Sequence, residues 1–495
     1  MSGVAELADR RADPRRVARW MALVACVCAA LGPLAAERLL ATADRETEGG
    51  PLLRALASDA APTGPSGRVV VLLVDGLRRD EAARLPAWRR LAPESVTGTV
   101  ALDEPTLSRP YYHALFTGVP QDASGVRSNR FGSRARHDSV MDRVRAAGGE
   151  VTVVAEGLDW MRRMHGPAGG SDARDALEGE LAVRGSPGLL VVHVVSTDRT
   201  AHEEGIRAAS HRDALALTDA VLSRLARIED ATLVVTSDHG HLDEGGHGGL
   251  EPIVARAPLL VRAPGLAPSR LDAPVRAPAL APTLSHWLGV ARPRSATEAP
   301  PVALVGGAGE DEWYRRATAL VVTHRALERA RLSRMHRWIL PPLAFALFAL
   351  IGPIKRGFGL GRAVPVAMVL WPALLLGLHV AMGRPLSLSA IDARPDHVAR
   401  VLFLGASAAA LAIALALPLA RGALRLRLAR VAATVGWSQL AVTLLALAWV
   451  GFALGPWPLS PLERYLPLLL AGASAAALPV VAVSLYASAW GSGAR

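Results

Sequence analysis

Three apolar stretches decide the fold of this chain: RVVVLLVD at residues 68–75, GLLVVHVVS at 188–196 and ATLVVTSD at 231–238. Each stretch is rich in Val and Leu and lacks polar alternation, which is typical of a strand buried on both faces of a parallel sheet. Two further runs, VTVVA at 151–155 and PLLVR at 258–262, have the same character. The sequence therefore predicts a mostly parallel sheet.

Helical patterns between these strands complete an α/β fold, for example at Ile206–Ile228 and Ala277–Leu288. In such sheets, ligands bind at the carboxyl ends of the strands. Three of the strands end in polar residues: Asp75, then Ser196-Thr197-Asp198, then Ser237-Asp238-His239. We therefore expect a functional site at this edge of the sheet.

The polar strand ends and the residues after them contain six candidate metal ligands: Asp75, Asp198, His202, Asp238, His239 and His247. Carboxylate and imidazole together suit zinc, with manganese as the second choice. Six ligands fit two ions about 4 Å apart, an arrangement that clamps both oxygens of a phosphoryl displacement. Taken one at a time, these residues could be helix caps or surface pairs. Their joint occurrence at three strand ends favours the metal site.

The segment EPTLSRPYYHALFTG at residues 104–118 supplies a candidate nucleophile. Thr106 and Ser108 precede Arg109-Pro110 and an apolar helical pattern, which indicates a helix N-terminus. A phosphate at this position would meet free backbone N–H groups and the positive end of the helix dipole. On its own, Ser108 could equally be a plain helix cap.

Together, VDG, PTLSRP leading into a TG-ended helix, D-x-x-x-H and SDHG resemble the alkaline phosphatase superfamily, over residues 68–290. Within it, the sequence is similar to the nucleotide pyrophosphatase/phosphodiesterases and to the GPI ethanolamine-phosphate transferases. The string SRPYYHALFTGVPQDASGV and a histidine soon after SDHG, in GGHGG, resemble the transferases more. The phosphodiesterases have this last histidine much later, where the chain offers only His286.

The resemblance implies the roles of individual residues. It selects Ser108 over Thr106 as the nucleophile, through a phosphoseryl intermediate, and it nominates Asn129, with Arg109, as phosphate-binding. It implies that one ion is held by Asp75, Ser108, Asp238 and His239, and the other by Asp198, His202 and His247. We assign His241, Asp243 and Glu244 no role beyond contacts around the ligands, and Glu156, Asp159 and Trp160 are candidates to line the substrate pocket.

Six apolar runs predict membrane spans: 17–34, 338–354, 363–382, 401–420, 431–454 and 465–489. Each approaches or exceeds the roughly 20 residues that a span needs. The arginines before residue 17 also fit a cleaved signal peptide, but the length of the run favours a retained anchor. The basic loops after the second and fourth runs should be cytoplasmic. This topology places both termini in the cytoplasm and residues 41–337 outside it.

We therefore expect five parts: residues 1–40 as the cytoplasmic N-terminus and first anchor, 41–67 as a linker, 68–310 as an extracytoplasmic alkaline-phosphatase-like domain, 311–337 as a juxtamembrane helix, and 338–495 as an all-α bundle of five spans. The net charge is +11, but almost all of the excess lies among the C-terminal apolar runs. Such a distribution orients a membrane protein and argues against nucleic acid as a partner. No obligate protein partner is evident.

The predicted function is transfer of a phosphoethanolamine-type group from a phospholipid donor to a glycolipid or glycan hydroxyl, in a bacterial inner membrane. The first alternative is a membrane-anchored phosphodiesterase or phosphatase that hydrolyses phosphate esters. The second alternative is a non-catalytic scaffold or transporter. The C-terminal runs argue against a transporter, because His379 is nearly their only ionisable residue and transport paths usually need several.

The loop charges predict the membrane topology directly. A reporter that is active only outside the cytoplasm should work when fused near Gly307 or Ala390. It should be silent when fused near Gly359 or Arg425, because the basic loops around these positions stay inside. Reporter activity near Gly359 would overturn the orientation.

Overall fold

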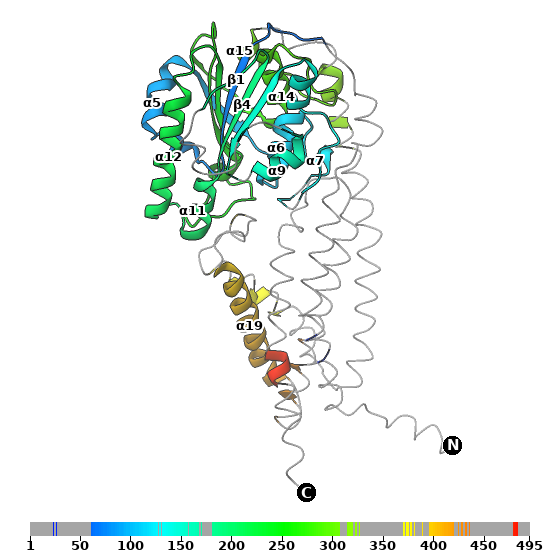
Figure 1. Cartoon of the computed structure of the whole chain (residues 1–495). Coiled ribbons are helices and arrows are strands. Elements are labelled where there is room, and N and C mark those ends of the chain that lie inside the picture. The colour runs from blue at the N-terminus through cyan, green and yellow to red at the C-terminus, as the bar shows by residue number, and fades with distance from the viewer. Residues whose placement is uncertain are drawn as a thin grey trace, which may run out of the picture.

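The computed structural model describes residues 61–126, 128–129, 131–156, 158–167, 170 and 181–306, together with shorter pieces elsewhere in the chain, of which 314–319 and 396–419 are the longest. Its main body is an α/β domain with one mixed sheet (Figure 1). Within the described residues the strand order is β3 (Glu150–Ala155), β4 (Gly188–Val194), β1 (Arg68–Val74), β5 (Thr232–Thr236), β6 (Arg256–Arg262), β2 (Val96–Ala101) and β7 (Ser269–Arg270), and β8 (Val275–Arg276) also pairs with β2.

The five apolar runs singled out in the sequence form β1, β3, β4, β5 and β6. The strands β3, β4, β1 and β5 are parallel neighbours, as predicted. For β6 the predicted direction was wrong, because this strand runs antiparallel to β5. Residues 257–261 of β6 are buried. The apolar run therefore indicates that the strand is buried, but it does not indicate whether the strand is parallel or antiparallel to its neighbours.

The sequence analysis missed β2, which pairs antiparallel with β6. Its sequence, VTGTVA, is neither a continuous apolar run nor a strict alternation. Gly98 lies in its centre, where an added Cβ would come within 3.0 Å of the Leu271 side chain. The close approach of a neighbouring segment therefore explains the glycine that weakens the strand signal.

Helices cover both faces of the sheet (Figure 1). The helices α5 (Pro86–Leu91) and α12 (Ala209–Leu225) pack on one face, and α6 (Ser108–Thr117), α9 (Leu158–His165) and α14 (Ala277–Leu288) lie on the other. The other helical elements among the described residues of this body are α4 (Arg79–Ala82), η1 (Ala92–Glu94), α7 (Gln121–Ser124), α8 (Val140–Ala146), α11 (Ser196–Glu204), α13 (Pro252–Ala255) and α15 (Val302–Val305). The predicted helices at 206–228 and 277–288 correspond to α12 and α14.

Strand β1 connects the two layers of the core. Val70, Leu72 and Val74 belong to the cluster that includes residues of α5 and α12. Val69, Val71 and Leu73 belong to the cluster that includes residues of α6 and α14. Since successive side chains of a strand point to opposite faces, this division explains why β1 has no polar alternation.

The N-terminus of α6 differs from a plain helix cap. The cap residue is Leu107, without a side-chain hydrogen bond, and Ser108 is the first helical residue. The helix ends at Gly118, whose φ of 70° is left-handed and whose added Cβ would lie 2.6 Å from Ala296 Cβ. The structure thus leaves the Ser108 side chain free of a capping role, contrary to the cap interpretation.

The C-terminal part is described in pieces. The predicted span 401–420 coincides with α19 (Asp396–Ala416) and the turn η2 (Leu417–Leu419). Buried apolar residues from four of the predicted runs pack together there, including Trp371, Leu375, Leu404, Ala408, Ile413, Val431, Val435 and Val480. Residues 314–319 are helical, within the helix predicted at 311–337.

In the described part of the chain, no helix is both long enough and apolar enough to cross a membrane. Apart from Leu23 and Cys26, the predicted spans at 17–34 and 338–354 lie outside the described residues. Most of the runs 431–454 and 465–489 lies outside them too. The membrane bundle therefore stays a prediction.

Candidate active site

The carboxyl ends of three adjacent strands meet in one cluster of carboxylates and imidazoles. Asp75 follows β1, Asp238 and His239 follow β5, and Asp198 lies in the first turn of α11, which follows β4. Three sets of potential ligands have their donor atoms within 4.8 Å of one another: Asp75–Asp238–His239, Asp198–His202–His247 and Asp198–His239–His241. All six ligands expected from the sequence are in these sets, and His241 is an addition.

The first set lies next to the Ser108 hydroxyl. Ser108 Oγ donates to Asp75 Oδ1 at 3.4 Å and lies 3.5 Å from His239 Nε2. His239 Nε2 in turn lies 3.3 Å from Asp75 Oδ1 and 3.3 Å from Asp238 Oδ2. The first residue of α6 therefore presents its hydroxyl to a set of buried anionic and imidazole groups.

Asp75 is supported by Tyr112 and His193, which were not among the predicted site residues, and by Trp160, which was predicted to line the substrate pocket. The Tyr112 hydroxyl donates to Asp75 Oδ2 at 3.2 Å and lies 2.9 Å from His193 Nε2. Trp160 stacks on the Tyr112 ring, with centroids 5.2 Å apart. A signal for this group exists in the sequence, because His193 interrupts the otherwise apolar strand β4.

Asp238 is held by the turn that follows β1. Gly76 N donates to Asp238 Oδ1 at 3.0 Å, and Leu77 N donates to Ser237 Oγ at 3.0 Å. Asp238 is fully buried, and its Oδ2 makes no hydrogen bond with any described residue. Burying such an oxygen without a partner is costly, which is the first sign that a cation belongs here.

The electrostatics of the first set point the same way. Burial, and next the nearby Asp75, raise the pKa of Asp238 to about 7. Burial lowers the pKa of His239, but Asp238 and Asp75 raise it more strongly, to about 10. Burial and Asp198 raise the pKa of Asp75, while hydrogen bonds from His193 and His239 bring it below its usual range. Without a bound ion, the protonated His239 imidazole is therefore the cation that compensates these carboxylates. A divalent ion would take over that role and leave the His239 ring neutral, as a metal ligand must be.

The second set is centred on Asp198. Its Oδ1 lies 3.4 Å from His202 Nε2 and 3.7 Å from His247 Nε2. His247 Nδ1 donates to the Thr106 carbonyl oxygen at 2.8 Å, which leaves Nε2 directed to the site. Burial lowers the pKa of His247 well below its ordinary value, so the ring is neutral, as a metal ligand must be.

Thr106 has a different environment from Ser108. It is buried, its Oγ1 donates to the Gly249 carbonyl at 3.0 Å, and it accepts from Gly248 N at 2.9 Å. These bonds fasten the loop that carries His247 to the segment before α6. Ser108 therefore lies beside the first ligand set, whereas Thr106 holds the loop that carries His247, a member of the second set.

The predicted phosphate-binding residues lie at the N-terminus of α6. Asn129 Oδ1 accepts from Arg109 N at 3.0 Å, so the Asn129 side chain is close to the nucleophile's turn. The Arg109 guanidinium donates to the Phe131 carbonyl at 2.6 Å and lies over the Trp160 ring, 5.8 Å from its centroid. The structure brings Asn129 and Arg109 together, with neither of them among the ligand sets.

Glu156, which was proposed to line the pocket, has other surroundings. Glu156 accepts hydrogen bonds from Val195 N, from Ser196 N and from Ser196 Oγ, so its carboxylate anchors the start of α11. The Asp159 side chain lies outside the described residues. His286 Nδ1 lies 3.0 Å from Thr63 Oγ1, in none of the ligand sets, so the GGHGG histidine completes the second set.

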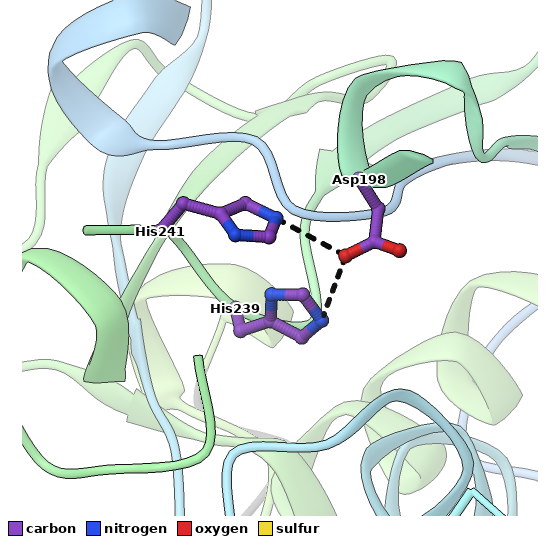
Figure 2. Close-up of side chains that lie close together, drawn as sticks. All are labelled: Asp198, His239 and His241. Atoms are coloured by element: carbon purple, nitrogen blue, oxygen red, sulfur yellow. Dashed lines mark ion pairs between the residues drawn. The ribbon is translucent and has the colours of Figure 1, made fainter. Parts of the chain in front are cut away.

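Asp243 and His241 follow His239 in the same loop. Asp243 pairs with Arg78 at 2.7 Å and with Arg207 at 2.6 Å, which ties this loop to the turn after β1 and to the segment after α11. His241 points at the ligands themselves: its Nε2 lies 3.1 Å from Asp198 Oδ1, as Figure 2 shows. The sequence analysis undervalued His241, although SDHGH is visible as an additional histidine two residues after His239.

Comparison with known proteins supports the superfamily. Residues 150–258 match the family described as "Type I phosphodiesterase / nucleotide pyrophosphatase". No curated protein matches the chain. The family match and the order of the motifs support the assignment of this domain to the alkaline phosphatase superfamily.

Three solved structures show what the chain is similar to. The wild-type alkaline phosphatase PafA has 11% identity and a TM-score of 0.39, over 50% of this chain and 100% of that one. Murine ectonucleotide pyrophosphatase/phosphodiesterase 5, an inactive variant with AMP, has 14% identity and a TM-score of 0.34, over 45% and 95%. The phosphonate monoester hydrolase from Silicibacter pomeroyi has 14% identity and a TM-score of 0.34, over 50% and 78%.

The two ligand sets predict the metal content of the purified protein. It should hold close to two equivalents of zinc, and Asp238→Ala and Asp198→Ala should each lose about one equivalent, measured by inductively coupled plasma mass spectrometry. Asp219→Ala is the matched control, because Asp219 accepts a hydrogen bond from Ala87 N away from the site. Full metal retention in both site variants would refute the two-ion assignment.

Proposed function

We propose that this site transfers a phosphoryl-type group from a phosphate ester through a phosphoseryl intermediate on Ser108. The observation that carries the proposal is the position of Ser108 Oγ, at the first residue of α6 and within 3.5 Å of both Asp75 Oδ1 and His239 Nε2. Ser108 also lies at the N-terminus of a ten-residue helix, whose dipole favours a phosphate there. Nucleophile, helix N-terminus and candidate ligands thus converge at one point.

The residues suit a pair of divalent ions, which we propose to be zinc. Asp75, Ser108, Asp238 and His239 would hold one, and Asp198, His202 and His247 the other. The buried oxygens Asp238 Oδ2 and Asp198 Oδ1 make no hydrogen bond with a described residue, which supports this assignment. Bound ions of this kind neutralise the charge that develops on the attacking and leaving oxygens.

The chain's own groups then perform two displacements. In the first, Ser108 Oγ attacks phosphorus as its hydroxyl proton leaves, the bond from phosphorus to the leaving oxygen breaks, and that oxygen takes up a proton and departs as the alcohol. In the second, an acceptor hydroxyl attacks the phosphoserine and gives up its proton, the bond from phosphorus to Ser108 Oγ breaks, and Ser108 Oγ is reprotonated. Tyr112 keeps Asp75 oriented throughout, because burial raises the pKa of its hydroxyl well above the ordinary value and keeps it a donor.

We further propose that the acceptor is an alcohol and that the transferred group is of the phosphoethanolamine type, moved from a phospholipid to a glycolipid or glycan hydroxyl at a bacterial inner membrane. The transferase-like string around Ser108 supports this choice, as does the GGHGG histidine. The α11 helix, which carries Asp198 and His202, lies at the end of the domain nearer α19 (Figure 1). Substrates embedded beside the C-terminal helices would therefore approach the side of the site formed by the second ligand set.

A contact between the two parts of the chain adds support. Ser389 belongs to the stretch between the third and fourth predicted spans, which the loop charges place on the same side as the catalytic domain. The Ser389 side chain is buried, accepts from Gly249 N at 2.8 Å and donates to Glu251 Oε2 at 2.7 Å. A residue of that stretch thus touches the loop that carries His247.

Hydrolysis is the second candidate. The matched family is described as phosphodiesterase and pyrophosphatase, and its 109 matched residues, from 150 to 258, include two carboxylates and four histidines of the ligand sets: Asp198, Asp238, His202, His239, His241 and His247. Both functions share the phosphoseryl step and differ only in whether water or an alcohol takes the group. Donor and acceptor in one bilayer have a high effective concentration, which favours the alcohol.

The nucleophile can be tested by trapping the intermediate. Acid quenching of a turnover mixture followed by peptide mass spectrometry should find the transferred group, phosphoethanolamine or phosphate, on Ser108, and Ser108→Ala should lower turnover by about a thousandfold or more without unfolding the protein. Thr106→Ala should keep measurable activity, because the Thr106 hydroxyl only fastens the His247 loop. Phosphate on Thr106, with activity retained in Ser108→Ala, would assign the nucleophile to Thr106.

Transfer can be separated from hydrolysis by reconstitution. With phosphatidylethanolamine and a glycolipid acceptor in vesicles, the protein should release diacylglycerol in step with modified acceptor, followed by lipid mass spectrometry. It should be slow on soluble nucleotide diesters, because those lack the membrane's effective concentration. Rapid cleavage of such diesters, with no lipid-derived group on any acceptor, would favour the phosphodiesterase function.

A further inference from the structure

His241 is a buried imidazole that the proposed chemistry does not use. It is 0% exposed, and neither ring nitrogen makes a hydrogen bond with a described residue. Its Nε2 nevertheless lies 3.1 Å from Asp198 Oδ1, an oxygen that also lacks a hydrogen bond (Figure 2). A buried imidazole that faces a carboxylate oxygen, with neither group hydrogen-bonded to a described residue, is an arrangement that a shared cation would satisfy.

The backbone makes room for this ring at the turn after β1. An added Cβ at Gly76 would lie 2.4 Å from His241 Nε2, and Gly76 has a left-handed φ of 74°. The loop between His241 and His247 is closed by hydrogen bonds between Leu242, Gly245 and Gly246. Its Gly245 packs so closely on α11 that an added Cβ would lie 1.8 Å from the Ala201 carbonyl. The position of His241 is therefore fixed from both sides.

The distances around Asp198 Oδ1 match those of a coordination sphere. Zinc ligands at about 2.0–2.2 Å from the ion in tetrahedral geometry lie about 3.3 Å from one another. Asp198 Oδ1 lies 3.1 Å from His241 Nε2 and 3.8 Å from His239 Nε2. Both values are within about 0.5 Å of that spacing, so small side-chain movements would suffice.

We propose that His241 is a metal ligand, and that Asp198, His239 and His241 form a central triad between the other two ligand sets. The triad shares His239 with the Asp75–Asp238 set and Asp198 with the His202–His247 set. The inference rests on the proposed binding of divalent ions to this site, and not on which group is transferred or on which acceptor receives it.

The sharing of ligands makes the central triad a competitor of the first set. An imidazole nitrogen offers one lone pair, so His239 Nε2 serves either the ion near Ser108 or an ion in the central triad. When metal is scarce, a first ion binds at Asp198, His239 and His241. When two ions are present, His239 turns to the Asp75–Asp238 set, and the second ion stays with Asp198. His241 thereby gives the protein a one-ion form distinct from the two-ion form.

The experiment is a titration of the metal-free full-length protein with Co²⁺, whose visible absorption reports the number and type of its ligands. His241→Gln should weaken the binding of the first Co²⁺ equivalent at least tenfold and change its absorption spectrum. His202→Gln should leave the first equivalent's spectrum unchanged and weaken only the second. His165→Gln is the matched control, because His165 is also buried with both ring nitrogens lacking hydrogen bonds, yet lies in none of the ligand sets.

Two outcomes would overturn the proposal. One is an unchanged first equivalent, in affinity and in spectrum, in a His241→Gln protein that melts at the wild-type temperature. The other is that His202→Gln weakens the binding of the first Co²⁺ equivalent as strongly as His241→Gln does. If His241→Gln does not fold, His241→Asn, which places a smaller amide there, replaces it. Failure of the proposed function is seen separately, as the lack of phosphate on Ser108 in the fully loaded wild-type protein.

Discussion

The structure depends on the convergence of two buried carboxylates, Asp75 and Asp238, and the half-buried Asp198 at the ends of three adjacent parallel strands. Like charges at this separation, removed from water, are strongly unfavourable unless cations or hydrogen bonds compensate them. Asp75 receives such bonds from Tyr112 and lies beside His193, while Asp238 receives one from Gly76 N. One oxygen of Asp198 and one of Asp238 stay without a hydrogen bond. The fold tolerates this cost because the same oxygens are the ones that a metal would take.

The antiparallel direction of β6, which the sequence did not reveal, also keeps ligands together at this edge of the sheet. A parallel neighbour of β5 would require a crossover back to the opposite edge of the sheet. Because β6 runs antiparallel, residues 237–255 remain at the carboxyl end of β5. This connection keeps three histidines, His239, His241 and His247, at the site. Hydrogen bonds between this loop and Thr106, and the ion pair between Asp243 and Arg78, then fix its path.

The sequence was sufficient where one residue pattern has one structural meaning. Continuous Val and Leu runs identified β1, β3, β4, β5 and β6, and the polar residues after three of these strands located the site, because parallel strands end at a common edge. It was insufficient where tertiary contacts decide. The strand β2 contains a glycine that only the approach of Leu271 explains, and the support of Asp75 by Tyr112 and Trp160 joins residues distant in the chain. Likewise, Glu156 could be identified as an anchor of α11 only from its contacts with Val195 and Ser196.

The loop between β5 and β6 links the nucleophile's segment to the C-terminal part of the chain. Thr106 bonds to Gly248 and Gly249 on one side, and Ser389 bonds to Gly249 N and Glu251 on the other. The buried backbone of Gly249 therefore takes part in both contacts. A displacement of Ser389 would reach His247 through this backbone and Thr106, because His247 Nδ1 donates to the Thr106 carbonyl oxygen. Packed hydrogen-bonded chains of this kind carry coupling between sites only when their elements have two arrangements. The structure shows one arrangement of this chain of contacts, in which the loop that carries His247 makes hydrogen bonds both to the nucleophile's segment and to Ser389.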